Sequence, residues 1–453
     1  MLARLPHMWM LCACAVGLQF AAHLLYGANS NISALSFAML WSMLGAGAIL
    51  APDTRNAVRL NAPLAAAAIC FVGVLAVGAF QLLPGVFGVS HPLWINVDGA
   101  SALTVDRDAT ARELVKVASL AGAFCTGLVI GVSDKRARFF VYCTLVAAGF
   151  YGAWAFLQQV LEPGTILGAP KPYHFNRLSG SFLSANSAAT VFGIFALVAT
   201  ARLTRAVKES GLGAGRGAST FDALARKGGL SAVVVALSLA CLLLTGSRAG
   251  AAATLGALLA FLAWEAHALG VRARARGLTP LMVIGALILV GAAALSGGDT
   301  FARLDTTAAD AGARLTVFTT HWRAILASPW LGHGLGGFPA VNDFMLDAQN
   351  HLSLERLNAL HNVYLQWLEE AGVFGAGLMF ACIGFLLAAI WRGFSERHAM
   401  RTWMRAVFAI SLLVCVHGLV DYALQVPSIA WLWATWLGVG CGVAAPTRRR
   451  GVE

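Results

Sequence analysis

The sequence predicts an all-α integral membrane protein of about 12 transmembrane helices, with a long helical loop on the non-cytoplasmic side. Three observations lead to this fold class. Hydrophobic residues make up 58% of the 453 residues, and charged residues only 12%, about half the fraction of a soluble protein. The apolar runs are long and unbroken, which is typical of helices and not of an alternating membrane β-barrel. Basic residues gather in short segments between those runs.

The apolar segments have about the length that crosses a bilayer as a helix, roughly 20 residues. They lie near residues 8–26, 35–51, 62–82, 113–132, 139–160, 183–201, 230–245, 250–269, 278–297, 363–391, 406–424 and 428–445. The first could also be a cleaved signal peptide, but an uncleaved helix makes the remaining topology consistent. Segments 35–51 and 230–245 are short, so we expect those two helices to be tilted or partly broken.

Lys and Arg determine the expected orientation. Of the 32 basic side chains, 22 fall in one set of connections, which includes both chain ends. The positive-inside rule therefore predicts that both termini are cytoplasmic. The net charge of +11 follows from this topology and does not indicate nucleic-acid binding.

The predicted topology divides the chain into three parts. Residues 1–297 carry helices one to nine, residues 298–362 form the long periplasmic loop, and residues 363–453 carry helices ten to twelve and a cytoplasmic tail. Within the loop, Leu315–Leu326 has a helical pattern. Connections of this length are uncommon unless they carry function, so we expect the site on this side.

Arg177 begins a segment rich in small polar residues, at the entrance of the sixth predicted helix. Its sequence is Arg177-Leu-Ser-Gly-Ser-Phe-Leu-Ser-Ala-Asn186. Backbone N–H groups and the positive end of a helix, beside a guanidinium, suit an anion. An interfacial arginine beside a capped helix would give the same pattern, so position alone leaves both interpretations open.

Arg248 lies in Thr245-Gly-Ser-Arg-Ala-Gly250, between the seventh and eighth predicted helices. Only a few residues turn the chain there, so Arg248 is expected at the membrane boundary or slightly within it. An arginine at that depth costs a few kcal/mol and is normally tied to function or to a fixed partner. A guanidinium also binds phosphate in a two-pronged way that lysine does not reproduce.

His361 closes the long loop and precedes the tenth predicted helix, in His361-Asn-Val-Tyr-Leu-Gln-Trp-Leu-Glu-Glu-Ala-Gly372. The spacing predicts that His361 and Tyr364 share one helix face. An imidazole titrates near neutrality and can accept a proton from a hydroxyl. The alternative is an interfacial histidine that caps the helix.

Three smaller features have structural alternatives. Asp106-Arg-Asp108 has a spacing that can hold a divalent metal, but Thr110-Ala-Arg-Glu113 also forms a capping-box pattern, which favours a structural role. Asp421, at the outer end of the eleventh predicted helix, could orient a histidine, pair with an arginine or be a solvated helix end. His333, in the glycine-rich Leu331–Phe338, is expected on a turn and not at a reacting centre.

Together these segments resemble the O-antigen ligase and polymerase superfamily of bacterial envelope glycosyltransferases. The resemblance covers about residues 170–425. The segments that carry it are Arg177–Asn186, Thr245–Gly250, Arg314…Trp322…Leu331–Phe338 and His361–Gly372. The sequence departs from the family at Ser184-Ala-Asn186, where a proline often precedes the asparagine.

The resemblance implies a membrane glycosyltransferase of the C type, in the bacterial inner membrane, with its active site on the periplasmic face. It implies a glycan donor linked to undecaprenyl pyrophosphate, and catalysis without a metal, a cofactor or a nucleotide sugar. By resemblance, Arg177 and Arg248 match the family's essential arginines, and His361 matches its essential histidine. Further substrate contacts are expected from Asn186, Arg314, Asn362, Tyr364 and Asp421.

The expected reaction is direct transfer of glycan to a lipid A–core hydroxyl. The arginines would stabilise charge on the leaving pyrophosphate, and His361 would take the hydroxyl proton. Three alternatives are a polysaccharide polymerase, a protein O-oligosaccharyltransferase and a transporter. The short tail Arg448–Glu453 argues against a protein-directed enzyme. Internal repeats and mid-membrane ionisable residues, expected of a transporter, are not evident.

Overall fold

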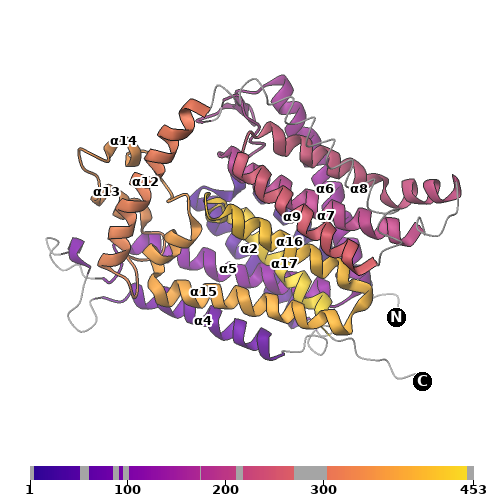
Figure 1. The fold of residues 1–453 in the computed structure, drawn as a ribbon. Helices are drawn as coiled ribbons and strands as arrows, with labels where there is room; N and C mark the ends of the chain where they lie inside the picture. Colours follow the sequence, from indigo (N-terminus) through magenta and orange to yellow (C-terminus); the bar gives the residue numbers. More distant parts are fainter. Residues whose placement is uncertain are drawn as a thin grey trace.

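The computed structural model describes residues 5–51, 61–84, 91–94, 102–173, 175–210, 218–269 and 304–445. Over these ranges the regular structure is helical apart from one short antiparallel hairpin (Figure 1). Nine helices within them are long and apolar enough to cross a membrane. The predicted all-α membrane fold is therefore confirmed, while the predicted span 278–297 lies outside the described residues.

Helices longer than 15 residues make up most of the described chain. They are α1 (Leu5–Leu24), α2 (Asn31–Leu50), α4 (Ala62–Gln81), α5 (Arg107–Gly131), α6 (Asp134–Leu161), α7 (Ala185–Ser210), α8 (Ala218–Leu244), α9 (Arg248–Leu269), α12 (Leu304–Ala327), α15 (Val363–Glu396), α16 (Arg401–His417) and α17 (Pro427–Ala444). The short elements are β1 (Thr165–Ile166), β2 (Ala169–Pro170), α13 (Phe338–Phe344), α14 (His351–Leu354) and the 3-10 turns η2 (Tyr26–Ala28), η4 (Pro92–Trp94), η5 (His398–Met400) and η6 (Ala423–Gln425).

Helices α2 and α8 are longer than predicted. Helix α2 has 20 residues and begins at Asn31, where the Ser30 side chain accepts a hydrogen bond from the Ser33 N–H. Helix α8 has 27 residues. The expectation of short, partly broken helices at 35–51 and 230–245 is wrong, because capping and polar first turns extend a helix beyond the apolar stretch that crosses the lipid.

Close helix packing in the bundle depends on glycines spaced four residues apart. Gly127 and Gly131 of α5 face α17, and Gly438 and Gly442 of α17 face α5. An added Cβ at any of the four would collide with the backbone of the other helix. Small residues at this spacing let helix backbones approach each other in a membrane, where no hydrophobic force pulls helices together.

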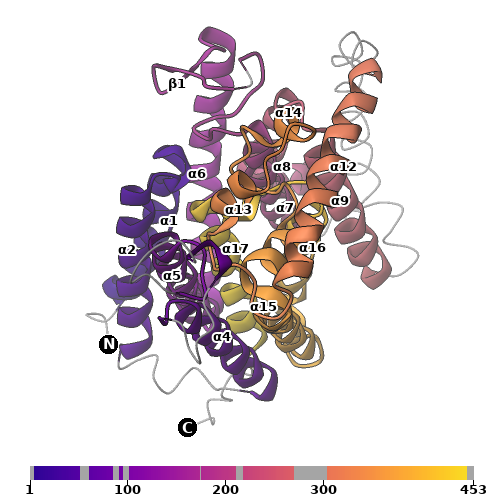
Figure 2. The ribbon, with the colours of Figure 1, turned by 90° about the vertical axis from the view of Figure 1, so that its left-hand side faces the viewer.

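The helices pack in two groups, and Figure 2 shows α2 and α5 of the first group to the left of α17 and α9 of the second group to its right. On one side α5 packs against α17 and α2, and α4 packs against α15. On the other side α7 packs against α8, α9 and α16, and α6 packs against α8. Helices α12, α13 and α14 gather at one end of the bundle, which we call the loop face (Figure 1).

Helix α15 is broken at Gly372, near the loop face. Gly372 has φ 62° and ψ −174°, a conformation that is open essentially only to glycine. The interrupted backbone groups bond to the preceding loop: the N–H groups of His333 and Gly334 donate to the carbonyls of Glu369 and Glu370, at 2.8 and 3.0 Å. Gly332, Gly334 and Gly336 all have positive φ. His333 therefore lies on a glycine-rich turn, as predicted, and this turn secures the break.

Gly372→Ala is expected to destabilise the fold. An added Cβ would collide with the backbone of Trp330, and the backbone conformation would be strained as well. We expect a loss of about 2–4 kcal/mol in unfolding free energy, seen as a lower Tm in a thermal-unfolding assay of the detergent-solubilised protein. Gly377→Ala, on the same helix with no heavy atom within 4 Å of its Cβ, is the matched control. Equal Tm values for the two variants would contradict this account of the break.

Candidate active site

Arg177 is fixed between two segments that are distant in sequence. Its Nε donates to the Thr245 carbonyl at 2.6 Å, and one terminal nitrogen donates to Asn186 Oδ1 at 3.4 Å. Next to Arg177, the Leu178 N–H donates to the Leu244 carbonyl at 2.9 Å. The α8–α9 turn and the entrance of α7 therefore meet at Arg177.

A nearly buried lysine supports the chain at Arg177. Lys171 Nζ donates to the Arg177 carbonyl at 2.9 Å and to Gln159 Oε1 at 3.2 Å. Only 4% of Lys171 is exposed, and burial lowers the pKa of its ammonium group. This contact fixes the backbone that carries Arg177.

Asn186 joins Arg177 to Asp421. While its Oδ1 accepts from Arg177, its Nδ2 donates to Asp421 Oδ1 at 3.2 Å. Asp421 is fully buried, so the alternative of a solvated helix end is wrong. A buried carboxylate that accepts from an amide fixes which way that amide points, and thus which atom it offers to the guanidinium.

Arg248 is the first residue of α9, and its side chain is exposed. The predicted turn of a few residues between two spans is found: α8 ends at Leu244, and Gly246 has φ +60°. The turn is secured from within, because the N–H of Ser247 donates to Thr245 Oγ1 at 3.2 Å. Arg248 thus lies three residues from the carbonyl that holds Arg177.

His361 lies outside helix α15 and not on a helix face with Tyr364. Asn362 is the N-cap, and its Oδ1 accepts from the N–H groups of Tyr364 and Leu365 at 3.0 Å. His361 has φ +57°, in the left-handed region that few non-glycine residues adopt. The predicted helical register and the alternative of a capping histidine are both wrong, since the chain turns sharply just before the cap.

The His361 ring packs edge-on against Tyr422, with 4.7 Å between ring centroids and 85° between planes. Tyr422 follows Asp421 and shares a hydrogen bond with Ser184, and burial raises the pKa of its phenol. The Ser184 hydroxyl also accepts from the Asn186 N–H at 3.2 Å. Tyr422 thus links His361 to the segment that carries Asn186.

The serine hydroxyls around Gly180 point into the protein and do not form an open anion site. Ser179 and Ser181 are buried, and Ser181 Oγ donates to the His23 carbonyl at 2.6 Å. Gly180 has φ +55°, and an added Cβ would lie 2.8 Å from the Tyr151 hydroxyl. Ser181 therefore anchors the entrance of α7, while anion binding by the backbone N–H groups of this segment stays a prediction.

Asn362 and Tyr364, two of the predicted substrate contacts, form hydrogen bonds within the protein. Asn362 caps α15, and its Nδ2 donates to the Leu419 carbonyl at 2.9 Å. The Tyr364 hydroxyl donates to the Cys415 carbonyl at 2.8 Å. Both therefore attach α15 to the end of α16. Arg314 lies on α12, and its role stays a prediction.

Sequence reasoning missed a buried histidine beneath this cluster. His417 Nδ1 lies 2.8 Å from Thr190 Oγ1, and its ring lies against Gly250. Its Nε2 is a buried nitrogen without a hydrogen-bond partner among the described residues. The available signal was its position four residues before Asp421, near the outer end of the eleventh predicted helix.

The possible metal motif at Asp106 is a helix cap. Asp106 Oδ1 accepts from the Ala109 N–H at 2.9 Å as the N-cap of α5. The capping box predicted from Thr110 is displaced, since Thr110 Oγ1 instead donates to the Leu335 carbonyl at 2.9 Å. The predicted structural role of this segment is confirmed, but the capping residue is Asp106 and not Thr110.

Residues 233–380, about a third of the chain, match a family model described as O-antigen ligase. Over these residues the chain is similar to the O-antigen ligase family, and the match supports that superfamily. This agrees with the resemblance found in the sequence and indicates a glycosyltransferase-like membrane enzyme. Arg248 and His361 lie within the matched residues, whereas Arg177 and Asp421 lie outside them. No curated protein matches the chain.

Gly246→Ala is expected to impair the enzyme by displacing Arg177. An added Cβ would lie 3.2 Å from Arg177 Nε, and φ +60° would be strained for alanine. We expect kcat/KM for glycan transfer to fall about tenfold or more if Arg177 acts on the substrate as the sequence predicts, because a misplaced cation loses its alignment with the group it binds. Gly256→Ala on α9, with open space around its Cβ, should retain full activity. Wild-type kinetics in Gly246→Ala would show that the position of Arg177 is unimportant.

Proposed function

We propose that this protein is an O-antigen ligase that transfers glycan from undecaprenyl pyrophosphate to a lipid A–core hydroxyl. The reaction takes place at the periplasmic face of the bacterial inner membrane, and both chain termini are cytoplasmic. The observation that carries the proposal is the bond from Arg177 to the Thr245 carbonyl, which joins two arginine-bearing segments at the loop face. Two guanidinium groups near each other suit a diphosphate.

In this mechanism Arg177 and Arg248 bind the pyrophosphate of the donor. The acceptor oxygen attacks the anomeric carbon, and the bond from that carbon to the phosphate oxygen breaks. Negative charge grows on the departing lipid pyrophosphate, so cations already fixed in place lower the barrier. Arg177 is prepared for this by its bonds to Thr245 and Asn186.

His361 takes the proton of the acceptor hydroxyl as the new bond forms. Its position against Tyr422 keeps the imidazole beside the segment that carries Asp421 and close to the residues that orient Arg177. Asn186 and Asp421 act as positioning residues, because they fix the guanidinium and not the reacting atoms. The mechanism uses only the side chains of this chain and the two lipid substrates.

Deletion of the gene in its host tests the proposal against its nearest alternatives. We expect lipopolysaccharide without attached glycan, together with accumulation of glycan polymer on the lipid carrier. Lipopolysaccharide that carries a single repeat would instead identify a polymerase. Intact lipopolysaccharide with loss of glycan from proteins would identify a protein-directed transferase.

A further inference from the structure

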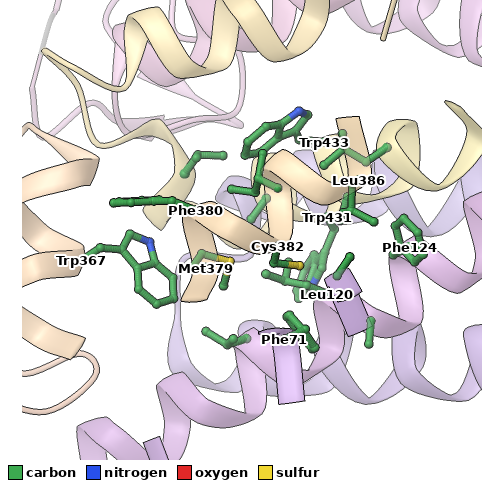
Figure 3. A pocket seen from close by; sticks show the side chains of 18 of the residues that line it. Phe71, Leu120, Phe124, Trp367, Met379, Phe380, Cys382, Leu386, Trp431 and Trp433 are labelled. Carbon is green, nitrogen blue, oxygen red and sulfur yellow. The ribbon is translucent and has the colours of Figure 1, made fainter. Parts of the chain in front are cut away.

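A cavity of about 810 Å³ lies between α4, α5, α15 and α17 (Figure 3). Side chains from all four helices line it, and most are aromatic or aliphatic. Phe71, Met379 and Trp431 lie around its inner part. A cavity with such a wall, inside a membrane protein, suits a hydrocarbon chain.

The polar side chains of the cavity wall gather at one end. Glu113 and Lys116 lie near the start of α5, Glu370 near the start of α15, and Gln425 just before α17. These helix ends are all at the loop face. From Glu113 to Leu128 the wall follows α5 for roughly 22 Å, and it becomes apolar along that path. This polarity matches a lipid whose head group lies at the loop face.

The polar end of the cavity adjoins His361. Val363 and Tyr364 line the cavity directly after His361 and the N-cap, and Leu424 lines it two residues after Tyr422. The N–H of Val363 donates to the carbonyl of Gly418, another lining residue, at 2.8 Å. The wall is thus continuous with the segments that hold the imidazole.

The cavity wall and the two arginines belong to different parts of the bundle. Among the described residues, its wall takes no side chain from α6, α7, α8 or α9, and Arg177 and Arg248 belong to that part of the bundle. Direct transfer brings two lipids to one site at the same time. In the proposed mechanism their heads meet at His361. Their chains must occupy separate volumes, because two chains cannot fill the same space in a close-packed interior.

We propose that this cavity binds a hydrocarbon chain of the acceptor lipid, while the chain of the donor lies elsewhere. This inference rests on the proposed function, and it assigns the acceptor, and not only the donor, to an intramembrane binding site. It also predicts that an apolar chain strengthens the binding of an acceptor, and a protein acceptor lacks such a chain.

Photo-crosslinking of the full chain in lipid nanodiscs tests the proposal without requiring transfer. Two probes are compared: lipid A–core with a diazirine on an acyl chain, and undecaprenyl pyrophosphate with a diazirine near its tail end. We expect the acyl probe to label cavity residues such as Leu120 and Met379, above the level of a diazirine phospholipid. Labelling of these residues by the polyprenyl probe, or equal labelling by the phospholipid, would overturn the proposal.

Filling the cavity provides the kinetic test. Ala121→Trp on α5 should raise KM for acylated lipid A–core about tenfold, the loss expected when roughly two buried methylenes are displaced. KM for the donor, and for deacylated core oligosaccharide, should not change. Ala434→Phe, on the α17 wall, should act in the same way and guards against a folding defect in the first variant.

Ala236→Trp, on an exposed part of α8, is the matched control and should behave as wild type. A rise in donor KM in the cavity variants would place the polyprenyl chain there and overturn the proposal. Specific acyl labelling in a protein that transfers no glycan would retain the lipid site and reject the proposed function. Transfer to lipid A–core without acyl labelling of the cavity would retain the proposed function and reject the lipid site.

Discussion

Arg248→Ala is expected to lower kcat/KM for glycan transfer by about 10²- to 10³-fold. In the proposed mechanism the exposed Arg248 side chain, at the start of α9, stabilises the charge that develops on the leaving pyrophosphate, and the variant lacks this cation. Arg177→Lys should give a comparable loss, although the charge is kept. A lysine lacks the planar set of donors with which Arg177 reaches Thr245 and Asn186 together.

A transfer assay with purified donor and acceptor measures these losses. Arg356→Ala is the control, because Arg356 is an exposed arginine (84% of its side chain) on the connection between α14 and α15. It should leave kcat/KM unchanged. Activity within about threefold of wild type in both Arg177→Lys and Arg248→Ala would rule out the diphosphate role, since such a loss is well below the effect of one transition-state donor.

His361→Asn is expected to reduce kcat by about 10²- to 10⁴-fold, the usual contribution of a positioned base. Asparagine is the preferred replacement because the backbone at position 361 is left-handed, with φ +57°, and asparagine tolerates this conformation. The variant therefore removes the imidazole without adding strain. KM for the donor should change little, because in the proposed mechanism the arginines, and not His361, bind its diphosphate.

The pH profile separates a base from a merely structural residue. An imidazole accepts a proton only when it is neutral, so the wild-type rate should fall as the pH drops, and the residual rate of His361→Asn should not show this fall. His351→Asn, on the exposed α14, is the matched control and should retain the wild-type profile. An unchanged kcat in His361→Asn would remove His361 from the mechanism.

Much of the fold could be predicted from local sequence properties. Uninterrupted apolar runs locate the membrane helices, because lipid requires each backbone to satisfy its own hydrogen bonds. The break in α15 could not be predicted in this way. It depends on Gly372 meeting Trp330 and on the N–H groups of His333 and Gly334 reaching the carbonyls that the break exposes. Such long-range backbone pairing leaves no periodic signal in the sequence.

In the candidate site, too, some features could be predicted from local sequence and others depend on long-range contacts. Alternating membrane crossings predict that Arg177, Arg248 and His361 share one face, and in the structure the starts of α7, α9 and α15 all contact the end of α16. The bond from Arg177 to the Thr245 carbonyl joins residues 68 positions apart, so no local pattern indicates it. The backbone conformation of His361 could not be predicted either. Helical spacing applies only from the cap at Asn362 onward, and His361 precedes that cap.

Affinity for the lipid carrier tests the central claim most directly. The full chain, in nanodiscs, is titrated with undecaprenyl pyrophosphate and with undecaprenol, which has the same chain and no phosphate. Wild type and His361→Asn should prefer the pyrophosphate by at least about a hundredfold, and Arg177→Ala combined with Arg248→Ala should abolish that preference. An undiminished preference in the double arginine variant would contradict the account.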